Sequence, residues 1–125
     1  MITTENKKKV SSDVLHDSKR ICIGSKHKGD YVNVHDVLYV EAFENYSWLH
    51  LTRGEKLLSC KPIKHYQDKF EANGFARIHR SHLVNLSHVK TYEKRYRLLY
   101  LKGNIMLSVS HRKNVSFSKM IADIN

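Results

Sequence analysis

The chain is organised around nine consecutive residues, Arg77-Ile78-His79-Arg80-Ser81-His82-Leu83-Val84-Asn85. Hydrogen-bond donors occupy four of the first five positions, and Leu83 and Val84 follow as apolar anchors. Guanidinium forks and imidazole rings between apolar residues suit a planar, anionic partner that accepts hydrogen bonds. We therefore predict that residues 77–85 form a DNA-reading loop on a β-rich scaffold.

Positive charge is concentrated in the second half of the chain. The 125 residues carry a formal net charge of +10 and have a sequence pI near 9.7. Residues 1–71 contain 12 Lys and Arg against 10 Asp and Glu, whereas residues 72–125 contain 10 against two. Evenly spread charge would serve solubility equally well, so a half that is almost entirely basic indicates nucleic acid or another anionic surface.

The remaining composition indicates a cytoplasmic protein. Cys22 and Cys60 both lie in apolar runs, which is typical of reduced, partly buried thiols, although the sequence does not exclude one disulfide. No apolar stretch approaches the roughly 20 residues that span a membrane. The N-terminus lacks the hydrophobic segment of a secretory signal.

Short apolar runs with a two-residue period predict a mainly β fold. We expect strands near 21–24, 31–34, 37–40, 48–51, 56–60, 89–92, 98–101 and 105–109. Turn sequences separate them at Lys28-Gly29-Asp30, Arg53-Gly54-Glu55, Glu93-Lys94-Arg95 and Lys102-Gly103-Asn104.

Two helices complete the expected fold. Pro62 at a first helical position and the apolar stripe of Ile63, Tyr66 and Phe70 predict a short helix near 62–72. Asn73-Gly74 would end it with a left-handed residue. A second apolar stripe, which begins at Phe117, predicts a C-terminal helix near 112–123. Residues 1–19 are polar and are expected to be a tail or linker, so the single domain spans 20–125.

Within the focal stretch, we weigh binding against a purely structural role. Arg77 and Arg80 can each donate in a fork to guanine or to a phosphate oxygen pair, with His79 beside them. Arg80 has no acidic neighbour in the sequence, which favours binding. For Ser81 and Asn85 a phosphate contact and a turn-capping role are both open, and we favour the structural role for Asn85.

Two further stretches carry candidate DNA-binding residues. His111, Arg112 and Lys113 precede the last helix, where cations oppose the helix dipole at a cost of about 0.3–1 kcal/mol that a bound phosphate would offset. Asn45 fits a turn between strands, and Ser47, which we place at the exposed end of this segment, is a candidate polar contact to DNA. The aromatic residues around them are expected to pack into the scaffold.

Metal, cofactor and catalytic sites are not predicted. His79, His82 and His88 form the closest histidine group, but no cysteine or acid lies near them in the sequence, as zinc sites usually require. Neither a nucleophile elbow nor a pair of carboxylates occurs in the basic half. We therefore expect neither enzyme activity nor a cofactor.

Three motifs together resemble the LytTR-type DNA-binding domain of bacterial transcription regulators. The motifs are Val37-Leu38-Tyr39-Val40-Glu41-Ala42 with Asn45-Tyr46, then Phe75-x-Arg77-Ile78-His79-Arg80-Ser81-x-x-Val84-Asn85, and Val109-Ser110-x-Arg112. The resemblance covers residues 21–121. It implies an elongated fold of three antiparallel sheets that reads the major groove through loops and not through a recognition helix.

Site residues follow from the resemblance by position. Base contacts would fall on Arg80, Arg112 and Ser47, and the two arginines must then lie on one face. Phosphate contacts or loop support would fall on the remaining candidates, Arg77, His79, Ser81, Asn85, His111, Lys113 and Asn45. His111 departs from the arginine that the family commonly has there, which makes the charge of this contact depend on pH.

The resemblance also implies partners. We expect double-stranded DNA with repeated half-sites, two copies of the chain on that DNA, and control by a receiver domain or sensor that lies outside this chain. The sequence allows either a stand-alone regulator or an output domain, and the polar tail after Met1 favours the first. The rival hypothesis is a basic protein-interaction module, such as an anti-activator that pairs with a related regulator without reading DNA. RNA binding is a third option.

Overall fold

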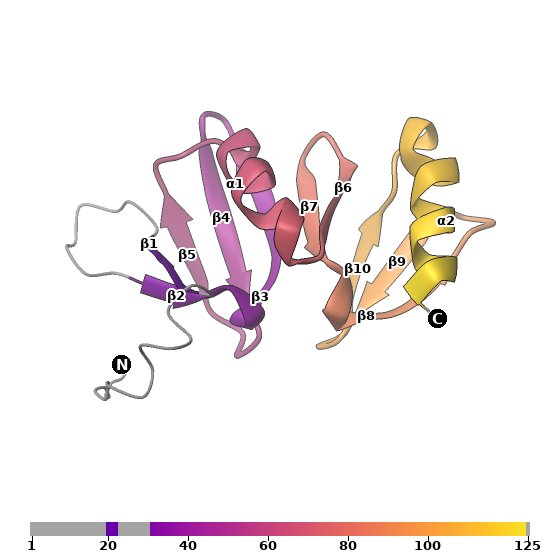
Figure 1. Cartoon of the computed structure of the whole chain (residues 1–125), viewed down its shortest axis with the longest axis horizontal. Helices are drawn as coiled ribbons and strands as arrows, with labels where there is room; N and C mark the ends of the chain where they lie inside the picture. Colours follow the sequence, from indigo (N-terminus) through magenta and orange to yellow (C-terminus); the bar gives the residue numbers. More distant parts are fainter. Residues whose placement is uncertain (1–19, 23–30, 125) are drawn as a thin grey trace.

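The computed structural model describes residues 20–22 and 31–124 of the chain. Within this part the fold contains three antiparallel sheets and two α-helices, arranged side by side along the long axis of the molecule (Figure 1). The prediction of a mainly β fold with two helices is therefore confirmed. The predicted tail at 1–19 and the turn Lys28-Gly29-Asp30 lie outside the described residues. No helix in the described ranges is long and apolar enough to cross a membrane.

A five-stranded sheet forms the centre of the molecule and has the strand order β5-β4-β3-β7-β6. Its strands are β3 (Val37–Phe43), β4 (Tyr46–Leu51), β5 (Lys56–Ser59), β6 (Phe75–His79) and β7 (His82–Asn85). The predicted hairpin across the turn at residue 54 is confirmed, because β4 pairs with β5. Each neighbouring pair is antiparallel, and β3 also pairs with β7 across a long sequence separation.

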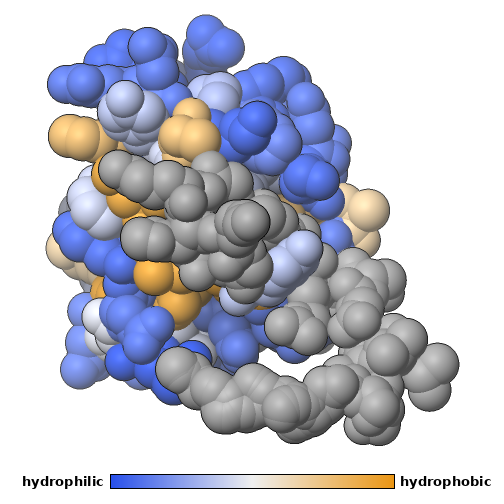
Figure 2. Space-filling view, turned by 90° about the vertical axis from the view of Figure 1, so that its left-hand side faces the viewer, coloured by the Kyte–Doolittle hydropathy of each residue, from blue (hydrophilic) through white to orange (hydrophobic). Residues whose placement is uncertain are grey.

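Two smaller sheets flank the central one. The two-stranded sheet consists of β1 (Arg20–Cys22) and β2 (Tyr31–Asn33). The three-stranded sheet has the order β10-β9-β8, with β8 (Val89–Glu93), β9 (Leu98–Leu101) and β10 (Ile105–Ser108). Figure 2 shows the end of the molecule near β5, where hydrophobic side chains interrupt a mostly hydrophilic surface beside the residues drawn in grey.

Both predicted helices are present, with small shifts at their starts. Helix α1 (Ile63–Phe70) continues into a 3-10 turn at Glu71–Asn73, and Gly74 closes it with φ 84°, as the sequence predicted. Pro62 is the residue before the first helical position and not the first one itself. Helix α2 (Asn114–Ile124) follows a 3-10 turn at His111–Lys113, so Arg112 precedes the helix that was expected to begin there.

Both faces of the central sheet contribute to buried cores, because residues at alternating strand positions enter two separate clusters. The first core lies between the sheet and α1 and contains Val40, Leu49 and Leu83 together with Tyr66 and Phe70 of the helix. The second core joins the other face to the three-stranded sheet and α2. Its members include the large buried residues Ile78, Val84, Leu99, Leu101 and Phe117. Helix α2 and its preceding turn are thereby fixed against β6.

The nine focal residues are not one loop, which corrects our interpretation of residues 77–85. They form the paired strands β6 and β7, and Arg80 and Ser81 alone make the turn between them. The reason lies in the apolar residues of the stretch. Ile78, Leu83 and Val84 are fully buried, and a strand satisfies their backbone groups while it places their side chains in the cores.

Candidate nucleic-acid interface

The side chain of Arg77 holds the turn between β6 and β7 through hydrogen bonds. Arg77 donates from Nε to the carbonyl of His79 at 2.9 Å and from Nη2 to the carbonyl of Arg80 at 2.5 Å. Its Nη1 donates to Oε1 of Gln67 on α1 at 2.6 Å. Burial lowers the pKa of Arg77 from its ordinary value. The guanidinium is thus committed to the fold, which supports the expected role of Arg77 in shaping the loop.

Gln67 is a component of the site that sequence reasoning missed. Gln67 lies on α1, ten residues before Arg77 in the sequence. An uncharged amide on a polar helix does not by itself indicate a functional site. The weak signal was the position. Gln67 is four residues after Ile63 and one after Tyr66, so it lies at the edge of the buried stripe, where a helix meets its sheet.

Two backbone hydrogen bonds attach neighbouring segments to this hairpin. Ala42 at the end of β3 donates its N–H to the carbonyl of Ser81 at 2.9 Å, and Ser110 donates its N–H to the carbonyl of Ile78 at 2.8 Å. The β3–β4 turn, the β6–β7 turn and the start of α2 consequently lie along one side of the molecule, at the top of Figure 1. Segments distant in sequence therefore share one surface.

The segment before α2 has its own fixed geometry. Ser110 accepts the backbone N–H of Lys113 at its hydroxyl oxygen, at 3.2 Å, and at its carbonyl, at 3.0 Å. Ser110 thereby caps the 3-10 turn, and the side chains of His111 and Arg112 are left exposed. Cations at this point lie beside the positive end of α2, an arrangement that an anion would stabilise.

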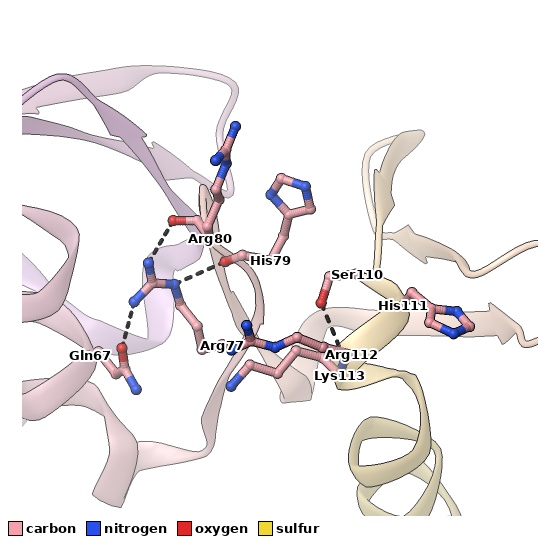
Figure 3. Close-up of a pocket in the computed structure, with 8 residues that line it drawn as sticks. All are labelled: Gln67, Arg77, His79, Arg80, Ser110, His111, Arg112 and Lys113. Carbon is pink, nitrogen blue, oxygen red and sulfur yellow. Dashed lines mark hydrogen bonds between the residues drawn. The ribbon is translucent and has the colours of Figure 1, made fainter.

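A cleft of about 530 Å³ lies between the two segments (Figure 3). Four cationic side chains line it, from three arginines and one lysine, and no carboxylate does. The lining residues are Gln67, Arg77, His79, Arg80, Ser110, His111, Arg112 and Lys113. In the described part of the chain, no hydrogen bond or ion pair engages the guanidinium of Arg80 or of Arg112. The two arginines predicted to make base contacts thus line the same cleft and remain available to an anionic, hydrogen-bond-accepting partner.

Four predicted site residues do not line this cleft, namely Asn45, Ser47, Ser81 and Asn85. Asn45 is exposed in the β3–β4 turn. Asn85 is buried at the opposite end of β7, where its Nδ2 donates to the carbonyl of Val37 at 3.0 Å and its Oδ1 accepts from Ser87. That network is structural, as we favoured for this residue.

The expectation of an exposed Ser47 is wrong. Ser47 is fully buried in β4, and its hydroxyl donates to the carbonyl of Lys61 at 2.8 Å. It shares the inward-facing register of Leu49 and Leu51, so a strand that buries those two leucines also buries the serine. A base contact by Ser47 would require the strand to open.

Two histidine side chains, His79 and His82, lie next to this turn. The backbone N–H of Ser81 donates to Nδ1 of His79 at 3.1 Å, and the rings of His79 and His82 lie 5.6 Å apart. Within residues 20–22 and 31–124, no three potential metal-ligating side chains come together. The two histidines therefore support the turn through hydrogen bonds and ring contacts.

Comparisons with known proteins identify the family of this chain. The family model of the LytTr DNA-binding domain matches residues 30–122. The chain belongs to the LytTr DNA-binding domain family. It is 26% identical over 122 residues to the sensory transduction protein LytR of Staphylococcus saprophyticus, covering 95% of this chain and 48% of that protein. It is 27% identical over 77 residues to the CO-responsive transcriptional regulator RcoM of Rhodospirillum rubrum, covering 62% of this chain and 32% of that protein.

The fold of this LytTr domain is similar to that of a solved relative. A LytTr DNA-binding domain from Bacillus cereus superimposes with a TM-score of 0.63 at 20% identity, covering 78% of this chain and 92% of that one. The chain spans less than half the length of each sequence relative. The resemblance read from the three sequence motifs is thus confirmed, and the family assigns DNA binding to the domain.

We expect the stability of this LytTr domain to fall as the pH falls below about 6.5, in part through His82. Burial lowers the pKa of His82 from its ordinary value of 6.5, and His79 and His50 act in the same direction against the opposing charge of Glu41. Its buried Nδ1 has no hydrogen-bond partner among the described residues, so a proton there would gain none. His82 therefore takes up a proton near pH 6.5 in the unfolded chain but only at a lower pH in the folded chain. Acidification consequently favours the unfolded chain.

The measurement is urea unfolding between pH 7.5 and 5 for the wild type and for His82→Gln. Other histidines titrate in the same range, so the difference between the two proteins isolates His82. We expect the wild type to lose more free energy of unfolding on acidification than the variant. Parallel pH profiles would show that His82 titrates alike in the folded and unfolded chain.

Proposed function

We propose that this LytTr domain binds double-stranded DNA sequence-specifically through turns that enter the major groove, and that the protein carrying it regulates transcription. The observation that carries the proposal is the convergence of Arg80 and Arg112 on one cleft without an acidic partner in its lining. Guanidinium groups of this kind read guanine through its O6 and N7 atoms. The segments that reach this side are the β3–β4 turn, the β6–β7 turn and the start of α2, which favours reading by turns.

Each side chain of the surface receives a role in this proposal. Arg80 and Arg112 contact base edges, and Lys113 and His111 contact phosphate oxygens next to the start of α2. Arg77, His79 and Ser81 shape the turn that presents Arg80, as their hydrogen bonds support. Asn45 reaches the backbone of the DNA from the β3–β4 turn. Ser47 has no role in DNA binding, because it is buried.

The partners are proposed on the same basis. One elongated domain presents a single reading surface, so we expect repeated half-sites and two copies of the chain on one operator. The relatives are longer than this chain, which supports an input such as a receiver domain or sensor in the complete system. We place the domain at residues 20–125, with residues 1–19 as the tail or linker, because β1 precedes the family match and pairs with β2 inside it.

Substitution of the two arginines separates reading from simple attraction. Arg80→Ala and Arg112→Ala should each weaken binding by roughly 1–3 kcal/mol and relax the preference at one base pair. Lys113→Ala should weaken binding to all sequences alike and reduce the slope of log K against log salt by about one. The site is first selected from random duplex DNA, and the variants are then titrated at several salt concentrations.

The same selection distinguishes the rival function. A basic protein-interaction module would elute late from heparin but would enrich no motif from random duplex DNA. Unchanged affinity and unchanged preference in Arg80→Ala would remove the β6–β7 turn from the reading surface. An enriched motif that depends on Arg80 and Arg112 supports the proposal.

A further inference from the structure

The β3–β4 turn exposes two large aromatic side chains that the proposed contacts leave unexplained. Phe43 is 44% exposed and Tyr46 is 43% exposed. The two residues are direct cross-strand partners, with Glu44 and Asn45 forming the turn between them. Directly paired residues project from the same face of a sheet, so both side chains lie on one face at the tip of the hairpin. Neither ring belongs to the two cores.

This aromatic pair lies on the proposed DNA-binding side. Phe43 follows Ala42 directly, and the backbone of Ala42 is hydrogen-bonded to Ser81 in the turn that presents Arg80. Figure 1 shows the β3–β4 turn on the same side of the molecule as the β6–β7 turn and the start of α2. A duplex that lies across the second and third of these segments would also meet the first.

The ring of Phe43 is held in place by its neighbours. It packs against Trp48 with ring centroids 6.3 Å apart and an interplanar angle of 42°. Nζ of Lys56 lies 4.4 Å from the centroid of the Trp48 ring on the same sheet face. The exposed edge of Phe43 is therefore a positioned surface, and a positioned side chain loses little conformational freedom when it binds.

The residue types in this turn point to bases and not to the phosphate backbone. The segment Phe43-Glu44-Asn45-Tyr46 contains no lysine or arginine, and its one charge is negative. Apart from the backbone contact proposed for Asn45, it offers no cationic attraction to phosphate. The major-groove edge of DNA offers one apolar group, the 5-methyl group of thymine, and phenylalanine is one of the side chains that contact it.

We propose that Phe43, with Tyr46 beside it, contacts a thymine methyl group in the major groove next to the base pair that Arg80 reads. This inference rests on the proposed function and adds to it a third reading element with a stated preference. The β3–β4 turn then selects a T·A pair through shape and apolar contact, whereas Arg80 and Arg112 select through hydrogen bonds. The operator would contain a thymine at a fixed distance from the position that Arg80→Ala relaxes.

The test removes the methyl group from the DNA and the ring from the protein. Each thymine of the selected site is replaced in turn by deoxyuridine, which leaves every hydrogen-bonding group unchanged. With the wild type we expect one position to weaken binding by about fourfold, which corresponds to roughly 0.8 kcal/mol for one buried methyl-sized group. In Phe43→Ala, thymine and deoxyuridine should bind alike at that position. Phe43→Leu should keep part of the difference.

Leu58→Ala is the matched control. Leu58 is 43% exposed and pairs with Trp48, so it projects from the same sheet face as Phe43, but it lies on edge strand β5 and not at the turn. This variant should keep the full sensitivity to deoxyuridine. A wild type that binds its site but tolerates deoxyuridine everywhere would overturn the inference, as would sensitivity that persists in Phe43→Ala. If no motif is enriched at all, the proposed function fails together with it.

Discussion

Replacing Arg77 by alanine is expected to lower the free energy of unfolding and to relax the preference at the base pair that Arg80 reads. Three hydrogen bonds disappear, to His79, to Arg80 and to Gln67. At about 0.5–1.5 kcal/mol net for each, the loss of stability should be roughly 1.5–4.5 kcal/mol. The turn that presents Arg80 also loses its support. We therefore expect the preference at the base pair read by Arg80 to be lost even under conditions in which the variant remains folded.

Two comparisons make this prediction sharp. Arg80→Ala should leave the free energy of unfolding within about 0.5 kcal/mol of the wild type, because the exposed side chain has no described partner, and yet it should relax the base preference. Arg77→Lys keeps the charge but not the planar fork, so it should behave more like alanine than like arginine. Urea unfolding and DNA titration of the three variants provide the measurements. Full stability in Arg77→Ala would mean that the three bonds do not hold the turn.

Much of the fold could be predicted because its signals are local. Apolar residues with a period of two marked the strands, and the stripe of Ile63, Tyr66 and Phe70 marked α1, whose three residues are all buried. Gly74 ended that helix in the left-handed region, as the dipeptide Asn73-Gly74 indicated. Signals of this kind are carried by neighbours in the chain, and tertiary contacts did not override them.

The errors came from local signals that competed with one another. Ile78, Leu83 and Val84 predicted strands, but the density of donors in the same nine residues led us to a loop. At Ser47, the polar side chain favoured exposure, whereas the alternation with Leu49 and Leu51 favoured burial. The apolar alternation was decisive in both places, because backbone pairing of a strand fixes the face of the sheet to which each side chain points.

The rest of the site could not be derived from the sequence, because it depends on contacts between distant segments. Arg77 and Arg80 are the same residue type three positions apart, and from the sequence each could donate in a fork to DNA. Their roles separate in the fold, where Arg77 faces α1 and meets Gln67 while Arg80 lies in the turn. The backbone hydrogen bonds donated by Ala42 and Ser110 join the β6–β7 hairpin to the β3–β4 hairpin and to the segment before α2, and they involve no side chain. Nothing in the residue types encodes them.

Replacing Phe117 by alanine is expected to have the largest effect on stability, because this residue fixes α2 to the rest of the domain. Phe117 is almost completely buried in the second core, and its ring packs edge-on against Tyr92 with centroids 5.0 Å apart. The Tyr92 hydroxyl also donates to Oδ1 of Asn114 at the start of α2. Removal of a buried phenylalanine side chain typically costs about 3–5 kcal/mol. Such a loss is a large part of the roughly 5–15 kcal/mol that stabilises a typical protein domain.

This substitution should also weaken DNA binding, although Phe117 does not line the cleft. Helix α2 carries the turn with Arg112 at its N-terminal end, so a helix that detaches from β6 moves Arg112 away from Arg80. Val115→Ala is the matched control, because Val115 lies on the same helix and is 66% exposed. We expect the control to stay within about 0.5 kcal/mol of the wild type in urea unfolding and to bind DNA normally. The role of α2 in positioning the turn at His111–Lys113 would be contradicted if Phe117→Ala unfolded like this control. Retention of the base preference contributed by Arg112 would contradict it as well.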